Sequence, residues 1–280
     1  MSVSVLQNPA GARIAAERPR RFLSDIVIDY GPVDVLGRLF LKADTELAEK
    51  GVTLEFTTLK EMKKVNEANR DSWRPLLPMF DHELTPVLPE NSFAMLARDS
   101  KGDVIGAQGG LLYTLTQANL KQEFESLRFF YRDPATQPLP GEMARITAPI
   151  ASEMYGRVAF VGAVWYRKDW RSKGLVMPMG RINRAYAFTR WYADYAISIM
   201  TEELVNAGFA KSAVWPHVEW DIHLTNVTTL RDKTFRLALI WTNVEEQLAH
   251  FRDYVGLDAE AEASAVARNA QVDARVHQRR

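Results

Sequence analysis

The chain has 280 residues, a formal net charge of zero at pH 7 and no cysteine. The absence of cysteine excludes disulfides, thiolate metal sites and cysteine nucleophiles, and it fits a cytoplasmic protein. The balanced charge gives no global field that would attract nucleic acid or an anionic membrane, so any anion recognition must be local. No apolar run approaches the roughly 20 residues that span a bilayer. We therefore expect a cytoplasmic protein without a nucleic-acid or membrane partner.

The N-terminal part of the sequence predicts a helix that precedes a first strand. Residues 1–21 are polar and predict a loose leader, without the apolar region of a secretory signal. Within residues 32–50 the apolar positions recur at helical spacing, between Gly-Pro before the segment and glycine after it. Residues 52–57 alternate and predict a strand. The Thr-Leu-Lys-Glu at residues 58–61 has the pattern of a capping box, which predicts the start of a further helix.

A proline-rich stretch follows this helix and predicts a long structured loop. Four prolines between residues 74 and 91 rule out a regular element over most of it. Long loops in compact domains often line a site. The exposed-looking side chains here make Trp73, Asp81 and His82 candidates for binding a substrate. The alternatives are a buried tryptophan and a surface charge pair.

The next part of the sequence predicts a hairpin and then becomes less regular. Residues 92–98 and 104–115 read as two strands joined by an Asp/Gly turn. Three glycines in the second strand predict a bulge or a close approach of the backbone. Residues 117–130 are compatible with a helix, and residues 143–155 with a helix or a loop.

The segment from Arg157 to Tyr195 carries the strongest functional signal. An almost wholly apolar run at residues 158–166 predicts a buried strand. After a polar turn comes the basic segment Arg-Ser-Lys-Gly-Leu at residues 171–175, and a helical pattern continues through Arg190. Strand, cationic glycine loop and helix in this order present backbone N–H groups to phosphate oxygens at the helix N-terminus. The alternative is a solvated basic turn that only starts a helix.

The C-terminal third predicts further strands and helices. A short strand is expected at residues 196–200, a helix from Thr201 to Gly208, and a strand within 209–215. The alternating residues 217–224 predict a strand with one polar face formed by His217, Glu219, Asp221 and His223. Beyond Thr225 the pattern is helical, and a last helix capped at residues 243–246 is expected to end near Gly256. No structure is predicted for residues 258–280.

The order of these elements resembles that of the GNAT superfamily of acetyltransferases. Within the segment 164–176, Arg171 and Gly174 match the first two landmarks of the family's acetyl-CoA pyrophosphate signature. Val176 departs from it, because the family prefers a small residue there. Ala207-Gly208-Phe209 resembles the family's second landmark. The resemblance covers roughly residues 52–224.

The resemblance implies an α/β fold with a mixed α+β sheet, enlarged by helices at both ends. Residues 1–51 would form the leader and a packing helix. Residues 52–224 would form the acyltransferase domain, with an insertion at about 116–156. Residues 225–280 would form a C-terminal helical extension and tail.

The resemblance also implies acyl-CoA-dependent N-acyltransfer, with acetyl-CoA as co-substrate and no metal. A primary amine of a small molecule would attack the thioester directly. The backbone from Gly162 to Trp165 would pair with the pantetheine arm, and the N–H groups of the basic loop would hold the pyrophosphate. The residues implied in cofactor binding are Ala163, Val164, Trp165, Arg171, Ser172, Lys173, Gly174, Leu175 and Val176.

The residues that would move protons are less clearly marked. Many members of the family have a tyrosine at the position that Leu204 occupies here, and a glutamate on the strand that precedes the loop. This strand has none, and Glu153 is the nearest. His217 and Glu219 are the other candidates, with a solvent-facing strand edge as the alternative. The polar face of residues 217–223 would also suit a metal ion, but no further landmark supports one.

Two rival functions stay open at this stage. The missing tyrosine and glutamate favour a non-catalytic acyl-CoA-binding or interaction protein on the same fold. The insertion at 116–156 favours a transferase for longer acyl chains or bulkier acceptors. The oligomeric state is open, with a homodimer as one alternative.

Overall fold

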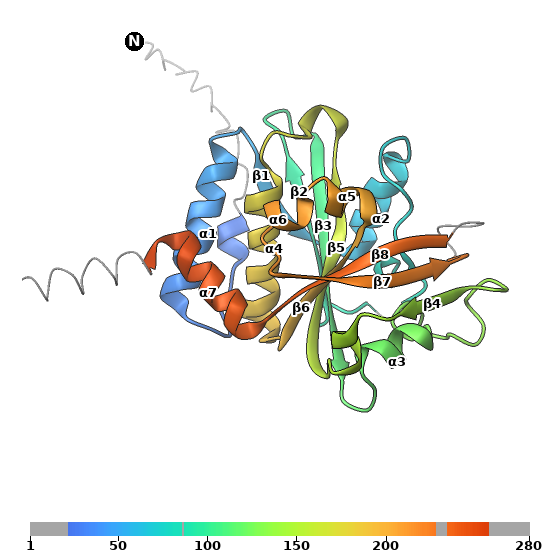
Figure 1. Cartoon of the computed structure of the whole chain (residues 1–280). Helices are drawn as coiled ribbons and strands as arrows, with labels where there is room; N and C mark the ends of the chain where they lie inside the picture. The colour runs from blue at the N-terminus through green and yellow to red at the C-terminus, as the bar shows by residue number, and fades with distance from the viewer. Residues whose placement is uncertain (1–21, 86, 228–233, 258–280) are drawn as a thin grey trace, which may run out of the picture.

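A computed structural model describes residues 22–85, 87–227 and 234–257 (Figure 1). The predicted leader and the C-terminal tail lie outside the described residues. The described chain forms one mixed sheet with helices on both faces, so the α/β fold expected from the sequence is confirmed.

The sheet has eight strands in the order β1-β2-β3-β5-β6-β8-β7-β4. All neighbours are antiparallel except β5 and β6, which are parallel. The strands are β1 (Thr53–Thr57), β2 (Ser92–Arg98), β3 (Val104–Leu115), β4 (Met143–Ile146), β5 (Gly156–Tyr166), β6 (Tyr195–Thr201), β7 (His217–Thr225) and β8 (Thr234–Asn243).

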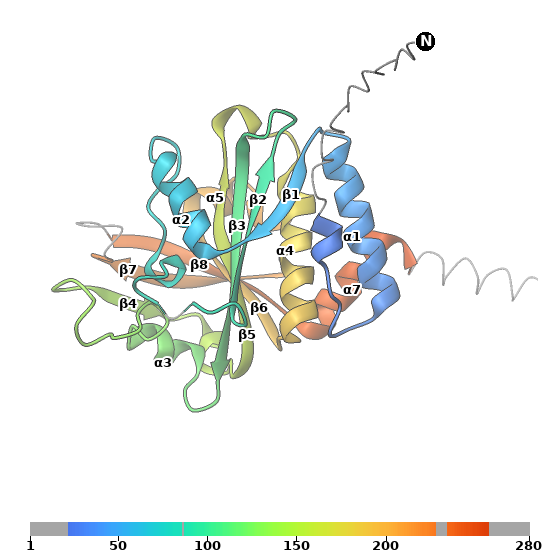
Figure 2. The ribbon, with the colours of Figure 1, turned by 180° about the vertical axis from the view of Figure 1, so that it is seen from behind.

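The helices lie in two layers, one on each side of the sheet (Figures 1 and 2). One layer contains α1, α4 and α7, and α1 contacts both of the others. The other side carries α2 and α3. The described α-helices are α1 (Val33–Ala48), α2 (Leu59–Ala68), α3 (Leu120–Glu125), α4 (Val176–Trp191), α5 (Glu202–Asn206), α6 (Phe209–Ser212) and α7 (Val244–Val255). Short 3-10 turns lie at Phe22–Asp25, Pro78–Phe80, Pro149–Ser152 and Lys168–Trp170.

Local sequence signals account for the helix ends. The Thr58 side chain accepts a hydrogen bond from the Glu61 N–H, as the predicted cap of α2 requires. Asn243 and Glu246 form a complete capping box at the start of α7. Gly256 ends α7 in the left-handed region, with φ of 77°. The predicted starts of α2 and α7 and the predicted end of α7 are therefore confirmed.

The sheet separates two hydrophobic cores. The helical layer packs its apolar residues, such as Phe40, Ile182 and Phe251, on one face. On the other face, α2, the proline-rich loop and α3 bury a second cluster that includes Phe80, Phe129 and Phe160. Glycines of β3 let aromatic rings approach the sheet, as predicted: a Cβ on Gly110 would lie 2.4 Å from the Phe93 ring.

Three predictions for the secondary structure are wrong. Residues 234–243 form β8 instead of continuing a helix, and β8 lies between β6 and β7. The sheet therefore extends beyond the range 52–224. Residues 209–212 form helix α6 and not a strand. In the insertion, residues 143–146 form β4 at the sheet edge beside β7, where a helix or loop was expected.

The predicted polar face of β7 is also wrong, because β7 contains a bulge. Between the pair Glu219–Leu239 and the pair Ile222–Leu237, β7 has one residue more than β8. Directly opposite residues share a face, so His217 and Glu219 lie on the same face as Ile222. His223 pairs with Arg236 and lies on the other face. The four polar groups therefore do not share one face.

Candidate active site

β5 and β6 diverge halfway along their length. They pair over three residues only, from Val158 opposite Tyr195 to Phe160 opposite Ile197. Beyond that point β5 stays paired with β3 as far as Tyr166, and β6 stays paired with β8. The edge of β5 that faces β6 therefore has no strand partner there among the described residues. We call this opening the β5–β6 cleft.

A bulge in β5 accompanies the divergence. Ala107 pairs with Trp165 and Gly109 with Gly162, so β5 has one extra residue between these pairs. Ala163 lies in the bulge with φ of 52°, in the left-handed region. Bulges bend a strand and increase its twist. The bulge thus turns the end of β5 at the candidate cofactor residues 163–165.

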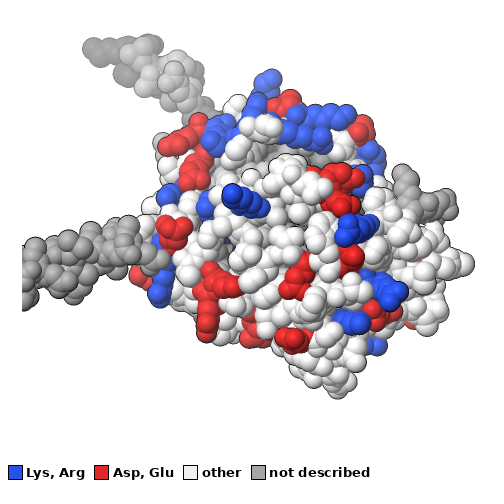
Figure 3. Space-filling view, in the orientation of Figure 1, with Lys and Arg blue, Asp and Glu red and all other residues white. Residues whose placement is uncertain are grey.

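The basic loop between β5 and α4 lies at the open end of the cleft. Ser172 and Gly174 have φ of 63° and 73°, which turns the chain tightly before α4. Leu175, the N-cap of α4, has no side chain that accepts from the first turn. The N–H groups at this helix end are therefore open to an anion, whose charge the helix dipole also favours. Figure 3 shows Lys and Arg side chains gathered along the top of the molecule, where this loop lies in Figure 1.

Arg171 braces the loop. Its Nε donates to the Tyr166 carbonyl at 3.1 Å, and its Nη2 donates to the Ser72 carbonyl at 3.1 Å. The guanidinium thus ties the loop to the end of β5 and to the segment after α2. Lys173 lies with its Nζ 4.3 Å from the centre of the Trp170 ring. Arg171 therefore has a structural task in addition to its charge.

Trp73 lies in the core beside this loop. Its exposed fraction is 7% and its ring stacks on Trp165 at 5.1 Å, nearly parallel. Phe80 is buried as well, with its ring 3.2 Å from a Cβ built on Gly162. For Trp73, the buried tryptophan given as the alternative in the sequence analysis is therefore correct. Trp73 packs against the end of β5 through Trp165. Its role in binding a substrate stays a prediction.

Asp81 and His82 lie in a local charge cluster. The Asp81 carboxylate accepts from Lys63 Nζ at 2.8 Å and from the Glu83 N–H at 3.0 Å. Lys63 also reaches Glu83 at 2.6 Å. The ring Nδ1 of His82 lies 3.9 Å from Asp81 Oδ1. These contacts hold the loop on α2, and substrate binding by Asp81 and His82 stays a prediction.

His217 and Glu219 lie at the level where the cleft begins. Across the sheet, His217 is opposite Trp241, which is opposite Ile197, the last residue of β6 that pairs with β5. The His217 ring stacks on Trp241 at 3.9 Å. Glu219 accepts from Trp241 Nε1 at 3.0 Å. The structure thus brings two of the three candidate catalytic residues together through Trp241.

Glu246 holds the imidazole of His217. Its Oε1 lies 2.6 Å from His217 Nε2. Burial alone would raise the pKa of the Glu246 carboxyl, but hydrogen bonds with His217 and the Asn243 N–H lower it overall. Glu246 is therefore charged at neutral pH and orients the ring. In the sequence, Glu246 was identified only as part of a capping box, and Trp241 carried no signal at all.

Glu153 follows a turn that contacts this cluster, because the Ile150 N–H in that turn donates to Glu219 Oε2 at 3.2 Å. It is exposed and follows the 3-10 turn that precedes β5. Leu204, in α5 beyond the end of β6, is 41% exposed.

The described residues contain no group of three or more His, Asp or Glu side chains that could hold a metal ion. Among the described helices, none is long and apolar enough to cross a membrane.

No protein-family model matches the chain, and no curated protein matches it. Solved structures do resemble its fold. A mutant of the spermidine N-acetyltransferase SpeG from Vibrio cholerae is 10% identical, with a TM-score of 0.42, over 71% of this chain and 97% of that one. A dodecameric form of the same enzyme is 10% identical, with a TM-score of 0.39, over 69% and 94%.

A structure described as a probable acetyltransferase is 11% identical, with a TM-score of 0.38, over 70% of this chain and 94% of that one. At this level of similarity, the substrates and assemblies named for these proteins are theirs alone.

Proposed function

We propose that the chain is an acyl-CoA-dependent N-acyltransferase, which transfers acetyl from acetyl-CoA to a primary amine of a small molecule by direct attack. The observation that carries the proposal is the β5–β6 cleft with the basic loop and the uncapped start of α4 at its open end. An unpaired strand edge offers N–H and C=O groups to an amide-containing arm, because such an arm can pair with it like a strand.

The residues of the loop fit an acyl-CoA. The left-handed Ser172 and Gly174 and the start of α4 provide backbone N–H groups for a pyrophosphate. Arg171 and Lys173 add positive charge, and Leu175 anchors the loop because its side chain is 2% exposed. Val176, at the first position of α4, is the one departure from the pattern.

The amine must lose a proton when it attacks the thioester carbonyl, and the leaving thiolate must gain one. His217 is our candidate for accepting the proton, directly or through water, and its support is that Glu246 holds the ring in a fixed orientation. Glu219 is the second candidate. Backbone N–H groups at the β5 bulge would donate to the oxyanion that develops on the carbonyl.

The test is acetyl-CoA binding by Arg171→Glu combined with Gly174→Asp. The control is Lys101→Glu combined with Gly102→Asp in the β2–β3 turn, because Gly102 is also left-handed, with φ of 86°, and has open space around it. Calorimetry should show that only the first pair abolishes binding. Equal binding of acetyl-CoA by both double variants would show that the basic loop is not the acetyl-CoA site.

The rival proposal is a non-catalytic acyl-CoA-binding protein, and it is favoured by Leu204 and by the absence of a glutamate on β5. Turnover on a panel of primary amines separates the two. Binding of acetyl-CoA without transfer to any of them would support the rival. Comparison of acetyl-CoA with a long-chain acyl-CoA tests whether the insertion at 116–156 selects a longer chain.

A further inference from the structure

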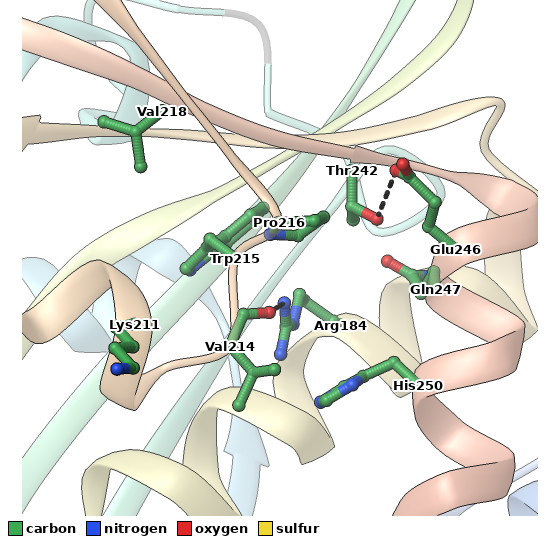
Figure 4. Close-up of a pocket in the computed structure, with 10 residues that line it drawn as sticks. All are labelled: Arg184, Lys211, Val214, Trp215, Pro216, Val218, Thr242, Glu246, Gln247 and His250. Atoms are coloured by element: carbon green, nitrogen blue, oxygen red, sulfur yellow. Dashed lines mark hydrogen bonds between the residues drawn. The ribbon is translucent and has the colours of Figure 1, made fainter.

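A cavity of about 310 Å³ lies on the helical face of the sheet, between α4, α6, α7 and the strands β7 and β8 (Figure 4). That volume falls within the range of small-molecule sites. Thr242 lines the cavity and pairs with Ala196, within the stretch where β6 is still bonded to β5. The cavity therefore lies beside the closed part of the β5–β6 pair, and it shares Glu246 with the cluster around His217.

A buried arginine lines this cavity together with Glu246, whose carboxylate is hydrogen-bonded to His217 and Thr242. Arg184 of α4 is 3% exposed, and it donates from Nη1 to Val214 O and from Nη2 to Ala213 O, both at 2.9 Å. Burial, and then the charge of Arg181, lowers the pKa of Arg184 to about 9, so the guanidinium stays charged at neutral pH. Within the described ranges, no carboxylate forms an ion pair with it. The two carbonyls use two of the five N–H donors of the guanidinium, which also lies 4.7 Å from the centre of the Trp215 ring. An anion in the cavity would further offset the cost of burying this charge.

Two residues of α7 present unpaired polar atoms on the same wall. Gln247 is 5% exposed, and its Oε1 has no hydrogen-bond partner in the described structure. The same holds for the buried Nε2 of His250. Both side chains project from α7 towards Arg184 in Figure 4. Burial, and then the charges of Arg184 and Arg181, lowers the pKa of His250 to about 4, so its ring is neutral at pH 7.

We propose that this cavity binds a small organic carboxylate that also carries an O–H or N–H donor and an apolar body. The carboxylate would accept hydrogen bonds from the guanidinium of Arg184. The exposed Lys211 of α6 also lines the cavity and would add positive charge. The donor would satisfy Gln247 Oε1, because a buried amide oxygen without a partner is costly. Trp215 and Val218 provide an apolar wall for the body of the ligand.

Calorimetric titration of the whole chain with acetate, benzoate and 4-hydroxybenzoate tests the proposal. The uncharged 4-hydroxybenzamide and inorganic phosphate are the comparison ligands. We expect 4-hydroxybenzoate to bind most tightly and the benzamide to bind at least about tenfold more weakly, because it lacks the charge that pairs with Arg184.

The decisive variant is Gln247→Glu, which keeps the shape of the side chain and supplies a carboxylate inside the cavity. It should weaken 4-hydroxybenzoate binding by about tenfold or more, and should raise the melting temperature of the free protein. The matched control is Gln122→Glu in α3, where a carboxylate can still accept from the Asn119 N–H. Lys211→Met provides a second test that leaves the buried wall intact, with an expected loss of a few-fold in affinity.

Four results would overturn the proposal. They are the failure of all three carboxylates to bind, equal binding of the benzamide, phosphate binding as tight as that of 4-hydroxybenzoate, and unchanged binding in Gln247→Glu. Phosphate binding would make the cavity an inorganic anion site. Absence of binding would leave it as a water-filled space.

Discussion

Because Arg171 braces the basic loop, substitutions at this residue can separate the effect of its charge on acyl-CoA affinity from the effect of the loop's geometry. Arg171→Lys keeps the positive charge, but a single ammonium cannot reproduce the fork that reaches the Tyr166 and Ser72 carbonyls together. Arg171→Met removes both the charge and the brace. If the acyl-CoA depends on loop geometry, both variants should bind it with similarly reduced affinity.

The magnitude follows from the two charge-assisted hydrogen bonds. At an exposed site each contributes about 0.5–1 kcal/mol, so their loss should cost about 1–2 kcal/mol of loop stability. The affinity for acetyl-CoA can fall by roughly tenfold in consequence. The control is Lys173→Met, which removes a charge and leaves the brace in place, and it should lose less.

The assay is a calorimetric titration with acetyl-CoA at two salt concentrations, together with a thermal melt of each variant. The drop in affinity caused by losing a charge should become smaller at high salt, because salt screens the charge. The drop caused by losing the brace should stay the same. Wild-type affinity in Arg171→Lys, combined with weak binding in Lys173→Met, would refute the reasoning, because charge alone would then carry the site.

Three further predictions concern packing, pH and proton transfer. Gly110→Ala should destabilise the protein by about 1–3 kcal/mol in a denaturant melt, because its Cβ would meet a buried phenylalanine ring at 2.4 Å. Gly37→Ala in α1 meets no atom within 4 Å and should stabilise by about 0.5–1 kcal/mol; the opposite order would refute the packing argument. The folded-state pKa of His250 is about 4, below its ordinary value of 6.5. Between these two pH values the unfolded chain binds a proton that the folded chain does not bind. The free energy of unfolding should therefore fall as the pH drops from about 6.5 to 4. With partial exposure taken into account, the loss is about 1–2 kcal/mol, and His250→Gln should abolish it; an unchanged slope in melts across this range would contradict the assignment. If His217 accepts the amine proton, His217→Gln should lower kcat by about a hundredfold or more, while Glu153→Gln should leave it near wild type; equal effects of the two substitutions would contradict this role.

The segment from β5 to α4 could be predicted because several local signals agree there. A nine-residue apolar run is long enough for a buried strand, and a glycine such as Gly174 adopts the left-handed conformation without a steric penalty. The caps of α2 and α7 were predictable for the same reason, since each depends on residues three positions apart.

The failures come from features that depend on distant parts of the chain. The apolar run Leu237–Trp241 in β8 has no alternation that distinguishes a strand from a helix, because β8 is buried on both faces in the middle of the sheet. The bulge of β7 adds a single residue to the pairing with β8, and that offset has no signature in the alternation of residues 217–224. The burial of Trp73 depends on Trp165, which is distant in sequence.

β4 has a consequence for how this protein can associate. It covers the outer edge of β7 only from Ile222 to Thr225, and its own outer side offers four residues to a further strand. At the opposite end of the sheet, β1 is only five residues long. Short edge strands are poor templates for continued pairing. Any second copy of the chain is therefore expected to associate through side chains of helices or loops, and not by extending the sheet from one molecule into the next.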